Sequence, residues 1–302
     1  MAEHNKLLIA LMIITTIVKI ITYAVNGNIS SDMFNNTTDT KYATDIIPAD
    51  WTISIWGFIY AWQVAWLLFA LIHIFRKTVD GPAYANPIIL TPIFYIAYIF
   101  NMVSNIAWVF LYRNDYIILA FVAYILLCAL LYICLFIVYK NLYQNGTLLQ
   151  KQGRNVEIWM HRLLVHNGLG IYASWATIAT VVNAVVVMMY GASPGVERVQ
   201  AGTVGLGIFS AGLGMFFVSD LFFLDKYSRY TLTPYMMICI ALGGSVDKHW
   251  DETKTNSIFT AVLLAIACIC AVVKVLLMIY RHIHKPLYPR TEIAPTIPDT
   301  KV

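Results

Sequence analysis

Charge is scarce in this chain of 302 residues: only 12% of them are Asp, Glu, Lys or Arg, whereas 60% are hydrophobic. An ordinary soluble domain carries about 25% charged residues, so the composition excludes that class. The few Lys and Arg form no basic cluster with interleaved aromatic residues, which disfavours a nucleic-acid partner. Apolar runs of about twenty residues, the length of a transmembrane helix, recur along the chain. They predict an all-α polytopic membrane protein embedded in a lipid bilayer.

The usual signatures of catalysis and metal binding are also missing. The sequence contains no Walker A or dinucleotide fingerprint, and no His and carboxylate pair has metal-ligand spacing within an apolar run. The motif Gly191-Ala-Ser193-Pro-Gly195 matches a hydrolase elbow, but it follows a helical run. Pro194 would also remove the backbone donor that an oxyanion hole takes from this position. We therefore expect neither an enzyme nor a metal site.

Eight apolar segments predict eight transmembrane helices. The first covers residues 6–25 and is expected to stay uncleaved, with Lys19 reaching toward the lipid headgroups. The others cover residues 52–75, 88–111, 116–139, 163–190, 201–223, 230–246 and 257–280. We divide the chain into a five-helix membrane core (1–190), three additional helices (191–280) and a Pro-rich, disordered cytoplasmic tail (281–302).

The distribution of Lys and Arg predicts the orientation. Eight helices place both termini on one side, and the cytoplasmic side of a membrane protein carries the excess of Lys and Arg. With the termini in the cytoplasm, the basic residues inside clearly outnumber those outside, which are Lys41, Arg113, Arg198, Lys248 and Lys254. Both termini are therefore predicted to be cytoplasmic.

Residues 26–50 are predicted to form a polar loop on the outer side of the membrane. This segment carries N-glycosylation sequons at Asn28, Asn35 and Asn36, which makes these asparagines candidate glycosylation sites. Because glycosylation requires the secretory route, the plasma membrane or another secretory-pathway membrane is favoured over the mitochondrial outer membrane.

Three of the predicted helices carry polar or aromatic faces that are costly toward lipid. In the second, Trp56 and Tyr60 share a face with Gln63, and the third has a polar stripe of Asn101, Ser104, Asn105 and Trp108. In the fifth, one face carries Tyr172, Trp175, Ala179 and Asn183. Such faces are expected to turn toward the helix bundle.

These stretches together resemble the translocator protein/tryptophan-rich sensory protein (TspO/MBR-like) family. Trp56-Gly-Phe-Ile-Tyr60 is similar to the family's W-x-x-x-Y, and Asn105-Ile-Ala-Trp108 is similar to its N-x-A-W. The stretch from Tyr172 to Asn183 resembles its Y-x-x-W-x-x-x-A-T-x-x-N. The motifs follow the family's order over roughly residues 5–190. The chain departs from short members by its three extra helices and by lacking prolines beside the third- and fifth-helix motifs.

The resemblance implies a five-helix bundle with an apolar cavity that binds a porphyrin- or haem-like tetrapyrrole or a sterol-like lipid. The implied ligand-binding residues are Trp56, Tyr60, Asn105, Trp108, Tyr172, Trp175, Ala179 and Asn183. Trp and Tyr rings offer stacking surfaces, and the Asn amides offer hydrogen bonds that orient a ligand. The alternative is that these side chains only hold the helices together.

Two further function classes stay open. A transporter would use residues 191–280 as a moving element, with Pro234 and Gly243-Gly244 as a hinge in a broken helix, although a short continuous helix fits equally well. A receptor or scaffold would couple to cytoplasmic partners through residues 140–162 or the tail, whose end from Thr300 to Val302 fits a PDZ groove. The partner is also left open between these cytoplasmic proteins and a second copy of the chain in a homodimer.

Two charged residues near the last helices are assigned no functional role. Asp220 lies close in sequence to Lys226 and Arg229 and is expected to be an interfacial ion. Lys274 lies within the last predicted helix and has no evident partner in the sequence.

Overall fold

The computed structural model describes residues 4–35, 42–78 and 81–288, and most of them are helical. The long helices are α1 (His4–Asn35), α3 (Ile55–Phe75), α4 (Pro92–Arg113), α5 (Ile117–Lys151), α7 (Asn167–Tyr190), α8 (Arg198–Val218), α10 (Thr233–His249) and α11 (Thr255–His284). The shorter elements are the helices α6 (Asn155–Met160) and α9 (Asp225–Ser228), the 3₁₀ helix η1 (Asp50–Ser54) and the π-helices η2 (His161–His166) and η3 (Ser219–Phe223). The strands β1 (Lys77–Thr78) and β2 (Gly81–Pro82) pair as a small antiparallel hairpin.

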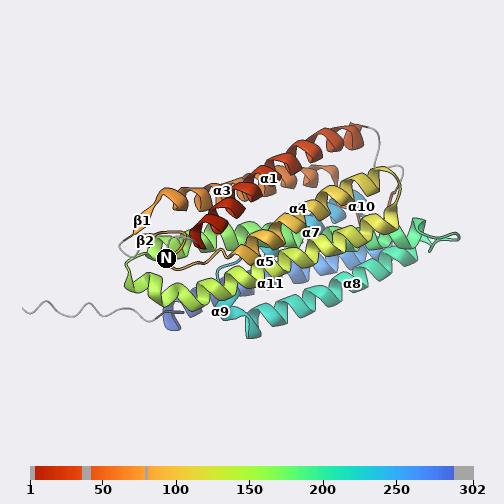
Figure 1. Cartoon of the computed structure of the whole chain (residues 1–302). Helices are drawn as coiled ribbons and strands as arrows, with labels where there is room; N and C mark the ends of the chain where they lie inside the picture. The colour runs from red at the N-terminus through yellow and green to blue at the C-terminus, as the bar shows by residue number, and fades with distance from the viewer. Residues whose placement is uncertain (1–3, 36–41, 79–80, 289–302) are drawn as a thin grey trace, which may run out of the picture.

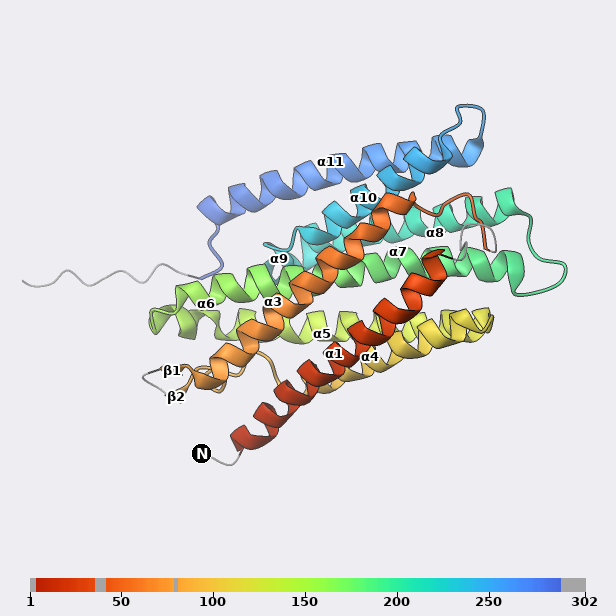
Figure 2. The same cartoon turned by 90° about the horizontal axis from the view of Figure 1, so that it is seen from above.

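The long helices run side by side along one axis, and successive ones point in opposite directions (Figures 1 and 2). The start of α1 and the end of α11 lie at the same end of this bundle, which we call the terminal end (Figure 2). Within the described residues, 7 helical segments are long and apolar enough to cross a membrane. The fold is thus an all-α polytopic membrane protein, as predicted. The remaining predicted span corresponds to α10, which has only 17 residues.

Several predicted boundaries are wrong because hydropathy marks only the part of a helix that lies in lipid. The predicted loop from residue 26 is helical as far as Asn35, since α1 continues beyond its apolar run. Likewise α5 extends past residue 139 to Lys151, and α11 extends into the predicted tail as far as His284. The rest of the tail from residue 289, including Thr300 to Val302, lies outside the described residues, as does Asn36.

The helix α7 occupies the centre of the bundle. It contacts α3, α5, α8 and α10, and its residues from Asn167 to Ala176 are all buried. Small residues allow these close contacts. At Gly168 an added methyl group would lie 2.9 Å from the Trp62 side chain, and at Gly170 it would lie 2.9 Å from Thr231 and Thr233. The stretch that carries the fifth-helix motif is therefore the packing axis of the fold.

The start of α10 is fixed by a side chain of α7. The Oδ1 atom of Asn167 accepts hydrogen bonds from the backbone N–H groups of Leu232 (2.9 Å) and Thr233 (3.2 Å). Pro234 sits in the first helical turn, where its missing N–H costs nothing. The helix then continues through Gly243-Gly244 without a break. The expectation of a broken helix is wrong, and the short continuous alternative is confirmed.

A buried ion pair joins the last helices. The Lys274 ammonium of α11 lies 2.6 Å from Oδ2 of Asp220 in η3, and both side chains are almost completely buried. Asp220 also accepts hydrogen bonds from Tyr235 of α10 (2.7 Å) and from Ser228 of α9 (2.5 Å). Asp220 therefore pairs with Lys274 instead of Lys226 or Arg229, its basic neighbours in the sequence, and Lys274 has a partner. Helical periodicity could not predict this pairing, because the two residues are 54 positions apart and Asp220 lies in a π-helical turn.

We predict that Lys274→Met destabilises the protein strongly, because it leaves the Asp220 carboxylate buried without a cation. Breaking a buried pair from one side costs about 3–5 kcal/mol. The double variant Asp220→Asn/Lys274→Met removes both charges and should recover most of that stability. Thermal unfolding of the detergent-purified protein measures the effect. Lys254→Met is a matched control, since its pair with Asp251 is exposed, and equal unfolding temperatures for Lys274→Met and this control would contradict the prediction.

Candidate functional site

The four predicted aromatic residues of α3 and α7 form one cluster. The ring centroid of Trp56 lies 5.6 Å from that of Tyr60 and 6.3 Å from those of both Tyr172 and Trp175. The rings meet tilted or edge to face, the geometry that aromatic quadrupoles favour. Tyr172 and Trp175 are buried, whereas Trp56 and Tyr60 are half-buried. The cluster therefore keeps some ring surface accessible.

The predicted amides lie beside this cluster. Nε1 of Trp108 on α4 donates to Oδ1 of Asn183 on α7 at 3.4 Å, and Nδ2 of Asn183 donates to the backbone oxygen of Ala179 at 2.8 Å. Oδ1 of Asn105 accepts from Asn26 of α1 at 2.8 Å. The predicted stripe on α4 does turn inward, because Asn105 is buried and Trp108 is half-buried. The structure thus brings the eight predicted site residues together, while their binding of a ligand stays a prediction.

A polar stripe on α1 completes this region and was missed by the sequence analysis. Thr15, Lys19, Thr22 and Asn26 are spaced by four, three and four residues, so they share one helix face, and all are buried. Besides its bond to Asn105, Nδ2 of Asn26 donates to the hydroxyl of Tyr60 at 3.1 Å. The spacing was visible in the sequence. It was overlooked because residues 26–50 were assigned to a loop and Lys19 to the headgroups.

Lys19 points into the bundle, which corrects the prediction that it reaches the headgroups. Only 2% of its surface is exposed. Its ammonium lies over the rings of Tyr23, Tyr98 and Tyr172, at 4.7, 5.5 and 5.1 Å from their centroids. The three aromatic faces attract the cation toward the centre of the bundle. Lys19 therefore joins the α1 stripe to the aromatic cluster through Tyr172.

Several buried polar atoms around this region have no hydrogen-bond partner among the described residues. They are Oγ1 of Thr15, Oδ1 of Asn26 and the hydroxyl of Tyr124, whose ring lies 4.9 Å from that of Trp108. Buried polar groups without partners are rare in folded proteins, and each calls for an explanation such as water or a ligand. We call the region bounded by the α1 stripe, the aromatic cluster and the amides the inner site.

The opposite face of α7 borders a separate cavity. This cavity has a volume of about 430 Å³ and lies between α5 and α8, with Ala173, Ser174 and Thr177 of α7 among its lining residues. Its lining is largely apolar, and Asp220 and Ser228 of the buried ion-pair network also border it. A volume of this size is within the range of small-molecule pockets. The helix α7 thus presents aromatic residues to the inner site, and Ala173, Ser174 and Thr177 to this cavity.

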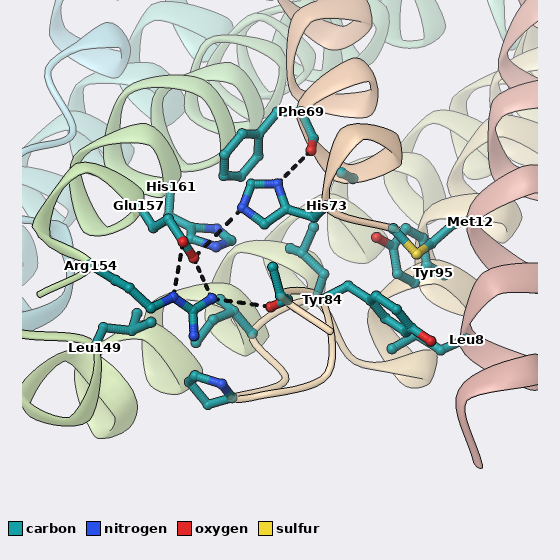
Figure 3. A pocket seen from close by; sticks show the side chains of 15 residues that line it. Leu8, Met12, Phe69, His73, Tyr84, Tyr95, Leu149, Arg154, Glu157 and His161 are labelled. Carbon is teal, nitrogen blue, oxygen red and sulfur yellow. Dashed lines mark hydrogen bonds and ion pairs between the residues drawn. The ribbon is translucent and has the colours of Figure 1, made fainter. Parts of the chain in front are cut away.

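An ionic cluster lies beside the hairpin at the terminal end of the bundle (Figures 2 and 3). The buried carboxylate of Glu157 accepts from Nε of Arg154 at 2.9 Å and lies 3.0 Å from Nη1 of Arg76. Nη2 of Arg154 also donates to the backbone oxygen of Ala83, just after β2, at 3.2 Å. These contacts fasten the hairpin to α6. They come from three separated segments, so no local pattern indicated them.

A small cavity lies beside the ionic cluster. Its volume is about 30 Å³, which is room for about two water molecules. His161 and Tyr95 line it, and His161 Nδ1 and the Tyr95 hydroxyl have no hydrogen-bond partner among the described residues. Figure 3 shows Tyr95 on the side of the cavity away from Glu157 and His161. Water is the ligand that this volume and these groups suit.

The chemistry available at the inner site is that of binding. It offers aromatic faces, amides, hydroxyl groups and one ammonium group, which can stack against a flat apolar molecule and orient it. Within the described residues, no group of three or more His, Cys, Asp or Glu side chains is placed to hold a metal ion.

Comparison with known proteins gives one match. A family model described as TSPO-like protein matches residues 6–280, a range that includes both the predicted five-helix core and the additional helices. No curated protein and no solved structure matches the chain.

Proposed function

The chain belongs to the TSPO-like protein family, and on this basis we propose that it binds a tetrapyrrole- or sterol-like ligand inside the membrane, as a binding or sensory protein. The observation that carries the proposal is the meeting of the three motif stretches at the inner site. The half-buried rings of Trp56 and Trp108 and the buried ring of Trp175 would supply the stacking surfaces. The amides of Asn105 and Asn183 would orient the polar edge of the ligand.

Quenching of tryptophan fluorescence by protoporphyrin tests this proposal. We expect saturable quenching of the detergent-purified protein. Trp175→Ala should weaken binding about tenfold, because an aromatic contact is worth roughly 1.5 kcal/mol. Trp159→Phe is the matched control, since Trp159 is 46% exposed and contacts Tyr230 and His282 instead of the inner site. Quenching that does not saturate, or that Trp175→Ala leaves unchanged, would count against binding at the inner site.

We also propose that the terminal end of the bundle faces the cytoplasm in a secretory-pathway membrane. The excess of Lys and Arg on that side supports this orientation. Asn28 and Asn35 then lie near the outer end of α1, where a glycosyltransferase could reach them before folding. Glycosidase treatment of the expressed protein should increase its electrophoretic mobility, and the triple variant Asn28→Gln/Asn35→Gln/Asn36→Gln should abolish that shift. Absence of a shift in the unmodified protein would contradict the orientation or the compartment.

A transporter is the second candidate function, and the 430 Å³ cavity favours it. This cavity borders the Asp220 network, and ionisable groups within a membrane commonly mark solute or proton pathways. In a transporter, α8 would move as a rigid body against α5 and α7. Because α10 is one continuous helix, we place any such movement at the helix ends.

Substitutions on α8 test the transport alternative. A Cβ atom added at Gly212 meets nothing within 4 Å, and Gly212 lines the cavity, so we expect a larger side chain there to enter it. Gly214 is equally unobstructed but does not line it, so Gly214→Phe is a matched control. If the cavity is a transport route, protein-dependent entry of protoporphyrin into proteoliposomes should be lost in Gly212→Phe and retained in Gly214→Phe. Entry equal to that of protein-free liposomes would exclude transport of this probe.

A further inference from the structure

The ammonium of Lys19 is a buried cation that contacts no carboxylate among the residues the structure describes. Its side chain is 2% exposed, near the middle of the apolar part of α1. In the part of the chain that the structure describes, no carboxylate and no hydrogen-bond acceptor contacts it, and its neighbours are the three tyrosine rings. Aromatic faces attract a desolvated cation, but this attraction is weaker than the cost of removing an ammonium from water. The tyrosine cage alone therefore leaves this charge undercompensated.

The second buried lysine of the protein provides an internal comparison. Lys274 is equally buried, but its ammonium lies 2.6 Å from the Asp220 carboxylate and donates to the backbone oxygen of Ser228 at 3.2 Å. At that position the chain supplies its own anion. At Lys19 the described residues supply none. The difference indicates that the anion for Lys19 comes from outside the chain.

The surroundings of Lys19 point to the inner site as the source of that anion. Tyr172, which contacts the ammonium, is also an edge-to-face neighbour of Trp56. Tyr23, the closest ring to the ammonium, lies 4.4 Å from the ring of Tyr60. An apolar ring system lying against the aromatic cluster would therefore have one edge near Lys19.

The unpartnered oxygens on α1 extend the same polar edge. Oγ1 of Thr15 lies one turn before Lys19, and Oδ1 of Asn26 lies two turns after it, about 10 Å along the helix. Both are acceptors without partners among the described residues, and the Thr15 hydroxyl can also donate. This side of the inner site thus suits a ligand edge that carries polar groups, with its anion at Lys19.

We propose that Lys19 binds a carboxylate of the ligand, so that the inner site selects flat, apolar molecules that bear an acid group. This inference rests on the proposed binding function and narrows it. An acidic tetrapyrrole satisfies the requirement through its propionate groups, whereas a neutral sterol does not. The carboxylate forms a charge-assisted hydrogen bond with the ammonium within the tyrosine cage, where the low dielectric strengthens the interaction.

The experiment compares protoporphyrin with its dimethyl ester, which has the same ring and no negative charge. The unmodified protein in detergent should bind the acid about tenfold or more tightly than the ester, as expected for a hydrogen bond between charged groups. Lys19→Met should weaken binding of the acid by a similar factor and leave the ester unchanged. Lys19→Arg should restore part of the preference for the acid, because it keeps the positive charge. Lys151→Met, at the exposed end of α5, is the control for removal of a lysine.

The outcomes separate this inference from the proposed function. If the unmodified protein binds both compounds equally, the role of Lys19 is overturned and binding at the inner site stands. If neither compound binds, the proposed function itself fails. A merely structural role of Lys19 would weaken acid and ester alike, which also overturns the inference. The preference of the unmodified protein decides the question even if Lys19→Met does not fold, a defect that its unfolding temperature would reveal.

Discussion

Within the hydrocarbon layer a polar side chain must be satisfied by protein, trapped water or a ligand, and this constraint sets how the helices face one another. Gln63 illustrates it most completely. Its side chain is fully buried, donates to the backbone oxygen of Gly168 on α7 (2.6 Å), and accepts from Trp66 (2.7 Å) and from Tyr98 on α4 (2.9 Å). One amide thus joins α3, α4 and α7. Because Gly168 has no side chain, α7 can approach α3 closely enough for Gln63 to reach its backbone oxygen. Helix packing and hydrogen bonding therefore both depend on Gly168.

The inner site differs from this junction because its polar groups are not all satisfied. Gln63 uses its donor and acceptor groups within the protein, whereas Lys19, Thr15 and Asn26 leave a charge and two acceptors without partners among the described residues. The contrast lies within one bundle and along neighbouring helix faces. A fold that pairs both polar atoms of Gln63 within the protein but leaves the α1 stripe incomplete supports the proposal that a ligand completes the stripe.

The sequence predicted the parts of this arrangement that depend on local periodicity. The stripe ending at Trp108 and the face from Tyr172 to Asn183 were assigned inward, because polar residues at helical spacing are costly toward lipid. The ionic cluster around Glu157 and the pair of Asp220 with Lys274 were not predictable in this way, because their partners come from distant segments. The π-helical turn at η3 also shifts the face on which Asp220 projects.

Lys19 was mispredicted for a different physical reason. A lysine in the second half of an apolar run ordinarily extends toward the headgroups, whereas Lys19 turns toward three tyrosines from α1, α4 and α7. Tyr98 and Tyr172 are not identifiable as partners from α1 alone, although Tyr23 lies on α1 four residues after Lys19. The stripe of Thr15, Thr22 and Asn26 on the same face was the signal that favoured an inward direction.

The most direct test of the central claim is an experimental structure of the protein with protoporphyrin bound. We predict the ring system against Trp56 and Trp175, with a propionate within hydrogen-bonding distance of Lys19 Nζ. A tetrapyrrole in the cavity between α5 and α8, or a Lys19 ammonium extended into the headgroup layer, would contradict it.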